Sequence, residues 1–154
     1  MQVQKVINKI LVTTDFSEES KAAFDMAADF AHKSGAAITL MTVVEVPGFV
    51  PYGNLAGVVG VLDGLHAELK AAATTRLKEW GTTTSAFAGL KVGAEVRQGV
   101  AYREIVQAAK DLDIDLIVIA THGHSGISGF LIGSVGEKVV RLAPCPVLTV
   151  KAKV

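Results

Sequence analysis

The chain alternates short apolar runs with amphipathic stretches, and this alternation is what most constrains its fold. The apolar runs cover residues 10–12, 37–44, 116–119 and 147–150, and an alternating run covers residues 91–97. Short apolar runs are typical of strands that are covered on both faces of a parallel sheet. In chain order, a helical pattern follows every run except the last, at residues 147–150. We therefore expect a β-α alternation with right-handed crossovers and helices on both faces.

The helical stretches have recognisable starts and ends. We expect helices over residues 18–34, 62–80, 105–112 and 134–143. Ser17 stands at the start of the first helix and Gly35 at its end, while Pro144 ends the last one. The stretch from Pro47 to Gly60 is rich in glycine and proline, which predicts a long loop that closes over a ligand or has another function.

Composition sets the protein class. A chain of 154 residues fits one domain, residues 1–154, and its 15 basic and 15 acidic residues give no formal net charge. Without a basic excess, nothing favours nucleic acid, and no apolar run approaches the roughly 20 residues that span a bilayer. The single cysteine, Cys145, cannot form an internal disulfide and fits a reducing compartment. We therefore expect a cytoplasmic protein that binds neither nucleic acid nor membranes.

The segment after the apolar run at residues 116–119 is suited to holding phosphate. Glycines stand at positions 123, 126, 129 and 133, and Ser134 opens the next helix. Glycine lets backbone N–H groups approach a ligand, and a helix N-terminus favours an anion. The segment is not a P-loop, since no lysine or arginine lies between Thr121 and Ser134. Backbone groups, hydroxyls and Mg²⁺ would carry the contacts, so binding would be moderate and sensitive to metal.

Two residues have structural alternatives to a ligand role. Ser134 and Glu137 have the spacing of a capping box, in which the serine hydroxyl caps the helix. Asp15 follows the first strand at the edge where parallel sheets bind ligands, and it serves either as a turn or cap residue or as a contact to ligand or Mg²⁺. No Ser/His/Asp arrangement or carboxylate pair predicts an enzyme.

Several motifs together resemble the universal stress protein family over essentially the whole chain. They are residues 14–17 (TDFS), residues 115–118 (DLIV), the segment from Gly123 to Gly133-Ser134 with nine residues between the glycines, and residues 144–147 (PCPV). The family's motif is usually Gly-x-x-Gly, nine residues, then Gly-Ser or Gly-Thr. The first of these glycines is Ala120 here, and position 124, often a basic residue in the family, is His124.

The resemblance implies a nucleotide site and a homodimer. It implies that Thr13, Thr14 and Asp15 face the nucleotide, that the Val43 backbone bonds the adenine, and that Gly123, Gly133, Ser134 and Val135 hold ribose and phosphates. Ala120, Thr121, His122 and His124 belong to the same loop. Asp15 or Ser134 would contact Mg²⁺. The edge strand Val147–Val150 would pair with its mate in a homodimer. The fold we expect is α/β, with a doubly wound five-stranded parallel sheet of strand order 3-2-1-4-5.

Four functions follow from these observations. The first is an ATP-Mg²⁺ binding module of the universal stress protein type, which acts in stress response or signalling through unidentified protein partners and at most hydrolyses ATP slowly. The second is a homodimeric interaction protein with a degraded site, suggested by Ala120 and His124. The third, an adenine-nucleotide hydrolase, would need a Ser-Gly-Gly-x-Asp-Ser loop after the first strand, where residues 14–17 (TDFS) stand instead. The fourth, a phosphoacceptor receiver domain, would need an acidic cluster at the first strand, where Asp15 stands alone.

Overall fold

The computed structural model describes residues 6–45, 56–121 and 132–152, and its sheet has the parallel strand order β3-β2-β1-β4-β5. The strands are β1 (Lys9–Thr13), β2 (Ala37–Val44), β3 (Val92–Gln98), β4 (Leu116–Ala120) and β5 (Val147–Val150). The helices are α1 (Lys21–Ser34), α2 (Ala56–Thr83), α3 (Ala101–Asp111) and α4 (Ser134–Leu142), with a 3-10 turn η1 (Ser85–Phe87). The predicted doubly wound α/β fold and its strand order are confirmed.

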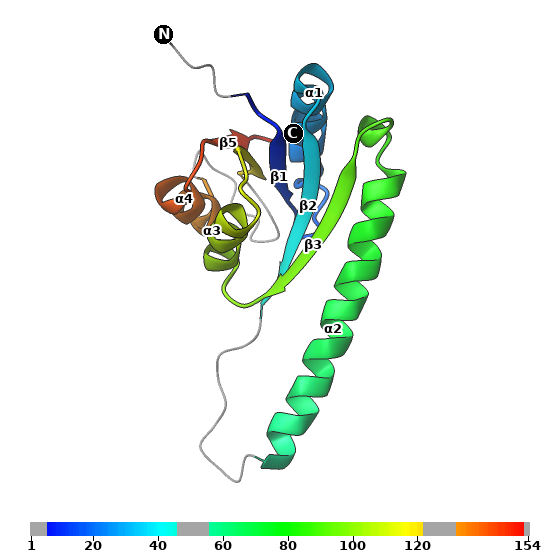
Figure 1. Ribbon diagram of the computed structural model, residues 1–154. Helices are drawn as coiled ribbons and strands as arrows, with labels where there is room; N and C mark the ends of the chain where they lie inside the picture. Colours follow the sequence, from blue (N-terminus) through cyan, green and yellow to red (C-terminus); the bar gives the residue numbers. More distant parts are fainter. Residues whose placement is uncertain (1–5, 46–55, 122–131, 153–154) are drawn as a thin grey trace.

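Helices cover both faces of the sheet (Figure 1). One buried cluster joins α1, α2 and η1 to the sheet, and its members include Phe24, Leu77 and Phe87. The second cluster joins α3 and α4 to the other face through residues such as Ile105 and Val139. Within β1, Ile10 and Val12 belong to the first cluster and Leu11 to the second. This two-sided burial explains why the strand is apolar at successive positions instead of alternating.

Several element boundaries differ from those expected. The first helix begins at Lys21 because residues 18–20 form a turn in which the Ser17 hydroxyl oxygen accepts the N–H of Ser20 at 3.2 Å. The second helix begins at Ala56, so the predicted loop from Pro47 to Gly60 is wrong for its last five residues, 56–60, while residues 47–55 lie outside the described residues. The glycines at 57, 60 and 64 weaken a helical signal without preventing a helix.

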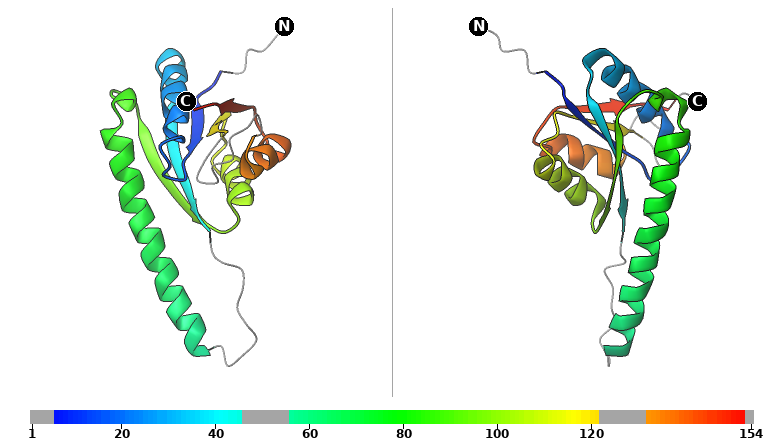
Figure 2. Two further views of the ribbon diagram at one scale, coloured as in Figure 1. Left: turned by 180° about the vertical axis from the view of Figure 1, so that it is seen from behind. Right: turned by 45° about the vertical axis from the view of Figure 1, so that its right-hand side comes forward.

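Helix α2 extends past the sheet. Its C-terminal half packs on the sheet, where Leu77 is fully buried, whereas its N-terminal half projects beyond the strands (Figure 2). Three large apolar side chains of the projecting half, Val61, Leu65 and Leu69, are exposed. Among the helices of the described ranges, α2 included, none has the length and apolar character that crossing a membrane requires.

Candidate functional site

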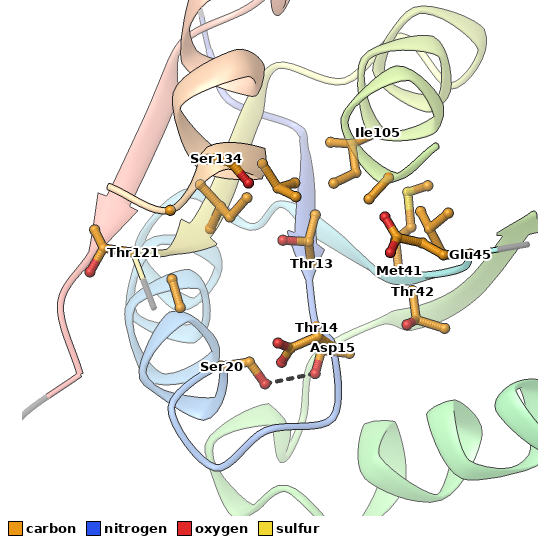
Figure 3. Close-up of a pocket in the computed structure, with 17 residues that line it drawn as sticks. Thr13, Thr14, Asp15, Ser20, Met41, Thr42, Glu45, Ile105, Thr121 and Ser134 are labelled. Carbon is orange, nitrogen blue, oxygen red and sulfur yellow. Dashed lines mark hydrogen bonds between the residues drawn. The ribbon is translucent and has the colours of Figure 1, made fainter. Parts of the chain in front are cut away.

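A cavity of about 450 Å³ opens at the carboxyl edge of the sheet. Figure 3 shows the side chains that surround it, which come from the ends of β1, β2 and β4 and from the first turns of α3 and α4. The strand order reverses between β1 and β4, which lie side by side in the sheet. This switch point is where open α/β sheets bind ligands, and volumes of a few hundred Å³ are typical of small-molecule sites.

The β1–α1 loop is built by its own polar side chains. The hydroxyls of Thr14 and Ser20 are 2.7 Å apart, and the backbone N–H of Phe16 donates to Thr14 Oγ1 at 2.9 Å. The Asp15 carboxylate accepts the backbone N–H of Ser17 at 3.0 Å as well as the Ser17 hydroxyl. The turn role foreseen for Asp15 is therefore present, and Asp15 also lines the cavity. Phe16 has a left-handed backbone, with φ of 64°.

The start of α4 does not show the capping box that was the alternative to a ligand role for Ser134. Gly133 is the N-cap residue, Ser134 is the first helical residue, and no side chain of the described residues caps this end. The Glu137 carboxylate instead accepts from Arg141 Nη2 at 2.9 Å, one helical turn further on. The Gly133 N–H donates to the Thr121 carbonyl at 2.9 Å, which ties together the two ends of the segment between them. Ser134, Val135 and Gly136 line the cavity, so α4 begins there, and no side chain of the described residues competes for the N–H groups of these three residues.

The end of β2 presents backbone groups to the same cavity. The Met41 carbonyl accepts the N–H of Thr14 at 2.9 Å, and the Val44 carbonyl accepts the N–H of Gly99 at 3.0 Å. Alternate residues of a parallel strand direct their backbone groups to the same side. Val43 therefore points its N–H and C=O toward the β1 side, like Met41, just past the place where β1 ends.

Most of the predicted site residues line this cavity. They are Thr13, Thr14, Asp15, Val43, Ala120, Thr121, Gly133, Ser134 and Val135. His122, Gly123 and His124 lie outside the described residues. Ala120 is the last residue of β4 and pairs with Val150, so its extended backbone accepts an alanine without strain. Gly133 leaves little room for a side chain, because a Cβ there would lie 3.3 Å from the Thr121 carbonyl oxygen.

The cavity also includes residues that the motifs did not single out. They are Ser20, Met41, Thr42, Glu45, Ala101, Ile105, Ile119 and Gly136. The position of Ala101 and Ile105 follows from the fold, since α3 begins directly after β3 at the same edge of the sheet. Glu45 follows β2 in the same way. A search restricted to the family motif could not find them, whereas the sheet-edge rule points to every strand end.

The electrostatics of the cavity are uneven. Its charged lining residues are Asp15 and Glu45, and no lysine or arginine is among the described residues that line it. In the described ranges, no group of three or more histidine, cysteine, aspartate or glutamate side chains could hold a metal ion. The first turn of α4 contributes positive potential at the cavity, because the N-terminus of a helix carries about half a positive charge.

Comparisons with known proteins agree with this architecture. The model of the "Universal stress protein family" matches residues 7–151. Universal stress protein MJ0531 of Methanocaldococcus jannaschii is 32% identical over 151 residues, which cover 96% of this chain and 84% of that protein. The solved structure of MJ0577, from the same organism, has a TM-score of 0.80 at 27% identity and covers 97% of this chain and 99% of that one.

One of the similar solved structures is described in complex with a cyclic nucleotide. It is a universal stress protein in complex with cAMP, with a TM-score of 0.61 and 26% identity. The alignment covers 97% of this chain and all of that one. The cAMP belongs to that protein. A chain with the same fold along its whole length has therefore been observed with an adenine nucleotide.

Proposed function

Because this chain belongs to the universal stress protein family, we propose that its cavity binds an adenine nucleotide, with ATP and Mg²⁺ as the first candidate ligand. Through this binding, the protein would act in stress response or signalling by contacting partner proteins. The observation that carries the proposal is the uncapped start of α4, which opens with Ser134 into a cavity of nucleotide size at the switch point.

The chemistry of the cavity matches the parts of a nucleotide. The backbone of Val43 offers one donor and one acceptor side by side, which suits the edge of an adenine ring. Thr13 and Asp15 supply oxygens where a ribose would lie between the base and α4. Ser134, Val135 and Gly136 supply backbone N–H groups for a phosphate. The cAMP complex of a similar protein supports an adenine nucleotide as the ligand class.

Magnesium would enter with the nucleotide. Mg²⁺ prefers oxygen ligands and usually keeps several waters while it is bound by one or two carboxylates and by substrate phosphates. Asp15, Glu45 and Ser134 present such oxygens at the cavity. The donor set therefore fits a Mg²⁺ ion that phosphates help to hold, and it does not fit a cation held by the protein alone. When bound, the ion would neutralise phosphate charge beside these carboxylates.

Calorimetry tests the ligand class. Adenosine, AMP, cAMP, ADP and ATP would be titrated into the full chain with and without Mg²⁺, with GTP as the control for the base. We expect heat with the adenine nucleotides and little with GTP. Mass spectrometry of the denatured protein would show whether nucleotide copurifies. If no adenine nucleotide produced heat or a thermal shift, the proposal would be wrong.

A degraded site is the second candidate. The two carboxylates of the cavity and the alanine at position 120 are the observations that favour it. In that case the native chain would act as an interaction protein without nucleotide, and Ala120→Gly would gain ATP binding that the native chain lacks. Nucleotide bound to the native protein after purification would reject this reading.

Self-association is the remaining proposal. In the described sheet β5 lies at an edge, next to β4 alone, and its sequence Val-Leu-Thr-Val is apolar. We propose that this edge pairs with the same strand of a second copy to form a homodimer. We also propose a cytoplasmic location, in keeping with the single cysteine, Cys145. Fractionation of cells that express the tagged chain would test the location.

A further inference from the structure

A smaller cavity of about 140 Å³, which we call the annex, adjoins the main one. Glu45, Ala101, Ser134 and Val135 line both cavities, so the two adjoin at the first turns of α3 and α4. Tyr102 of α3 and Lys138 of α4 line the annex but not the main cavity. The annex therefore extends the proposed nucleotide site past Ser134, into the space between the first turns of α3 and α4.

Lys138 supplies a full positive charge, which the described lining of the main cavity does not. Among the described residues that line either cavity, Lys138 is the one lysine or arginine, whereas Asp15 and Glu45 are acidic. Of the described groups around the main cavity, the start of α4 offers a phosphate the partial positive charge of the helix terminus. A second phosphate, further along the ligand, would meet a full positive charge if it entered the annex.

The position of Lys138 on its helix supports this role. Lys138 lies four residues after Ser134, so the two share one face of α4. Side chains on a helix tilt toward its N-terminus, which directs the long lysine chain back toward Ser134. Lys138 Nζ lies 4.8 Å from the centroid of the Tyr102 ring. An exposed cation–π contact of this kind is weak, so the ammonium can exchange the ring for a phosphate.

We propose that Lys138 is a specificity-determining residue that binds the second phosphate of ADP or ATP in the annex. The inference rests on the proposed function, since it assumes a nucleotide whose first phosphate lies at the start of α4. It goes further by assigning a preference for the diphosphate and triphosphate over AMP to one side chain. Lysine binds phosphate as a point charge, with donors that rotate to suit the oxygens.

Replacement of Lys138 is the decisive experiment. Adenosine, AMP and ADP would be titrated into the wild type and Lys138→Gln by calorimetry without Mg²⁺. Because a hydrogen bond between charged groups is lost, we expect ADP affinity to fall about tenfold, with AMP and adenosine changed less than twofold. Lys110→Gln, on the exposed surface of α3 and outside both cavities, removes the same charge and should bind all three ligands like the wild type.

One further variant separates charge from structure. Lys138→Arg should keep most of the ADP preference, since it keeps the cation. Equal losses for AMP and ADP in Lys138→Gln would overturn the assignment to the second phosphate, as would unchanged ADP affinity. Failure of the wild type to bind any nucleotide would instead reject the proposed function, and the role of Lys138 with it.

Discussion

At the residue scale, Glu45 is the acidic side chain that borders both the main cavity and the annex. Its carboxylate would repel the phosphates of a bound nucleotide. We expect Glu45→Gln to tighten ADP binding two- to fivefold without Mg²⁺, because the removed repulsion between partly solvated charges is about 0.5–1 kcal/mol. Calorimetry at low ionic strength would measure the change, and added salt should reduce it.

The control for Glu45 is another exposed carboxylate, outside both cavities. Glu18 forms a surface ion pair with Lys21 at 2.8 Å and lines neither cavity, so Glu18→Gln should not alter ADP affinity. Weaker ADP binding by Glu45→Gln would contradict the repulsion and show that the carboxylate holds a ligand hydroxyl or a cation. The expected change in ADP affinity has the opposite sign to that of Lys138→Gln. The two variants together therefore test whether charge in the annex determines ADP affinity.

Ser134 shows where residue-level prediction succeeds and fails. Its place at the start of a helix beside a glycine was predictable from sequence, and the structure puts it in the cavity. The capping-box alternative is not found, because Glu137 bonds Arg141 one turn later and Gly133 occupies the N-cap position. A four-residue pattern cannot reveal that an i,i+4 ion pair competes for the same glutamate. Tyr102 and Lys138 carry no local signal, since only packing brings α3 and α4 together.

At the element scale, two helices end in left-handed residues of different kinds. Helix α1 ends at Gly35, with φ of 75°, and α3 is followed by Asp113, with φ of 52°. The α3 end is a Schellman motif, in which the N–H of Ile114 donates to the Ala109 carbonyl at 2.9 Å. Glycine takes this conformation without steric cost, whereas a side chain resists it. The end of α1 can therefore be predicted from its glycine, whereas the end of α3 cannot be predicted from Asp113.

Exchange at these two helix ends should change stability in opposite directions. We expect Asp113→Gly to raise the free energy of unfolding by about 0.5–1 kcal/mol, since it relieves the left-handed backbone and removes a negative charge at a helix C-terminus. The corresponding rise in melting temperature is about 1–4 °C for a chain of this size. Gly35→Ala should lower stability by about 1 kcal/mol. Thermal unfolding by circular dichroism measures both, and a destabilised Asp113→Gly would contradict the strain.

Helix α2 holds the β1–α1 loop through an aromatic cluster. Trp80 packs edge-on against Phe16, with ring centroids 5.3 Å apart, and the Arg76 guanidinium lies 4.5 Å from the Phe16 ring centroid. Phe16 adopts its left-handed backbone beside Asp15, a lining residue of the cavity. Such a conformation persists only when the surrounding packing holds it. The cluster therefore connects the packing of α2 to the geometry of the proposed nucleotide site.

Removal of the Trp80 ring should affect both stability and binding. We expect Trp80→Leu to lower the free energy of unfolding by about 1–3 kcal/mol, from lost burial and lost ring contacts with Phe16 and Phe24. Because Phe16 would then relax, adenosine affinity should fall severalfold even at temperatures where the variant is fully folded. Trp80→Phe keeps a ring and should retain most of the affinity. A destabilised Trp80→Leu with wild-type affinity would show that the cluster serves stability alone.

At the scale of the whole molecule, the sheet was predictable because its strands are buried on both faces. Ile117 lies in one cluster and Val118 in the other, so β4 is uniformly apolar and its strand signal is unambiguous. The start of α2 could not be predicted, because the glycines at positions 57 and 60 weaken the helical signal there. The cavity followed from the rule for strand ends, whereas the annex depends on how two helices pack.

The edge strand β5 offers a specific test of the proposed homodimer. The N–H of Ile117 donates to the Pro146 carbonyl at 3.0 Å, and the N–H of Thr121 donates to the Val150 carbonyl at 2.8 Å. Since alternate residues face the same side, Leu148 also directs its backbone groups toward β4. Val147 and Thr149 direct theirs to the open edge, where a second copy would pair. Thr149 is therefore the position at which the dimer bonds can be changed without disturbing the sheet.

Thr149→Pro should separate the dimer while leaving each chain folded. Proline removes the outward N–H of Thr149 and keeps the bonds to β4, and an edge strand tolerates it. We expect the molecular mass measured by light scattering to fall from two chains to one, whereas Thr149→Val, which keeps the N–H, should stay dimeric. Leu65→Glu, on the projecting half of α2, should also stay dimeric. If Leu65→Glu were monomeric and Thr149→Pro stayed dimeric, the interface would lie on the exposed face of α2 and not at β5.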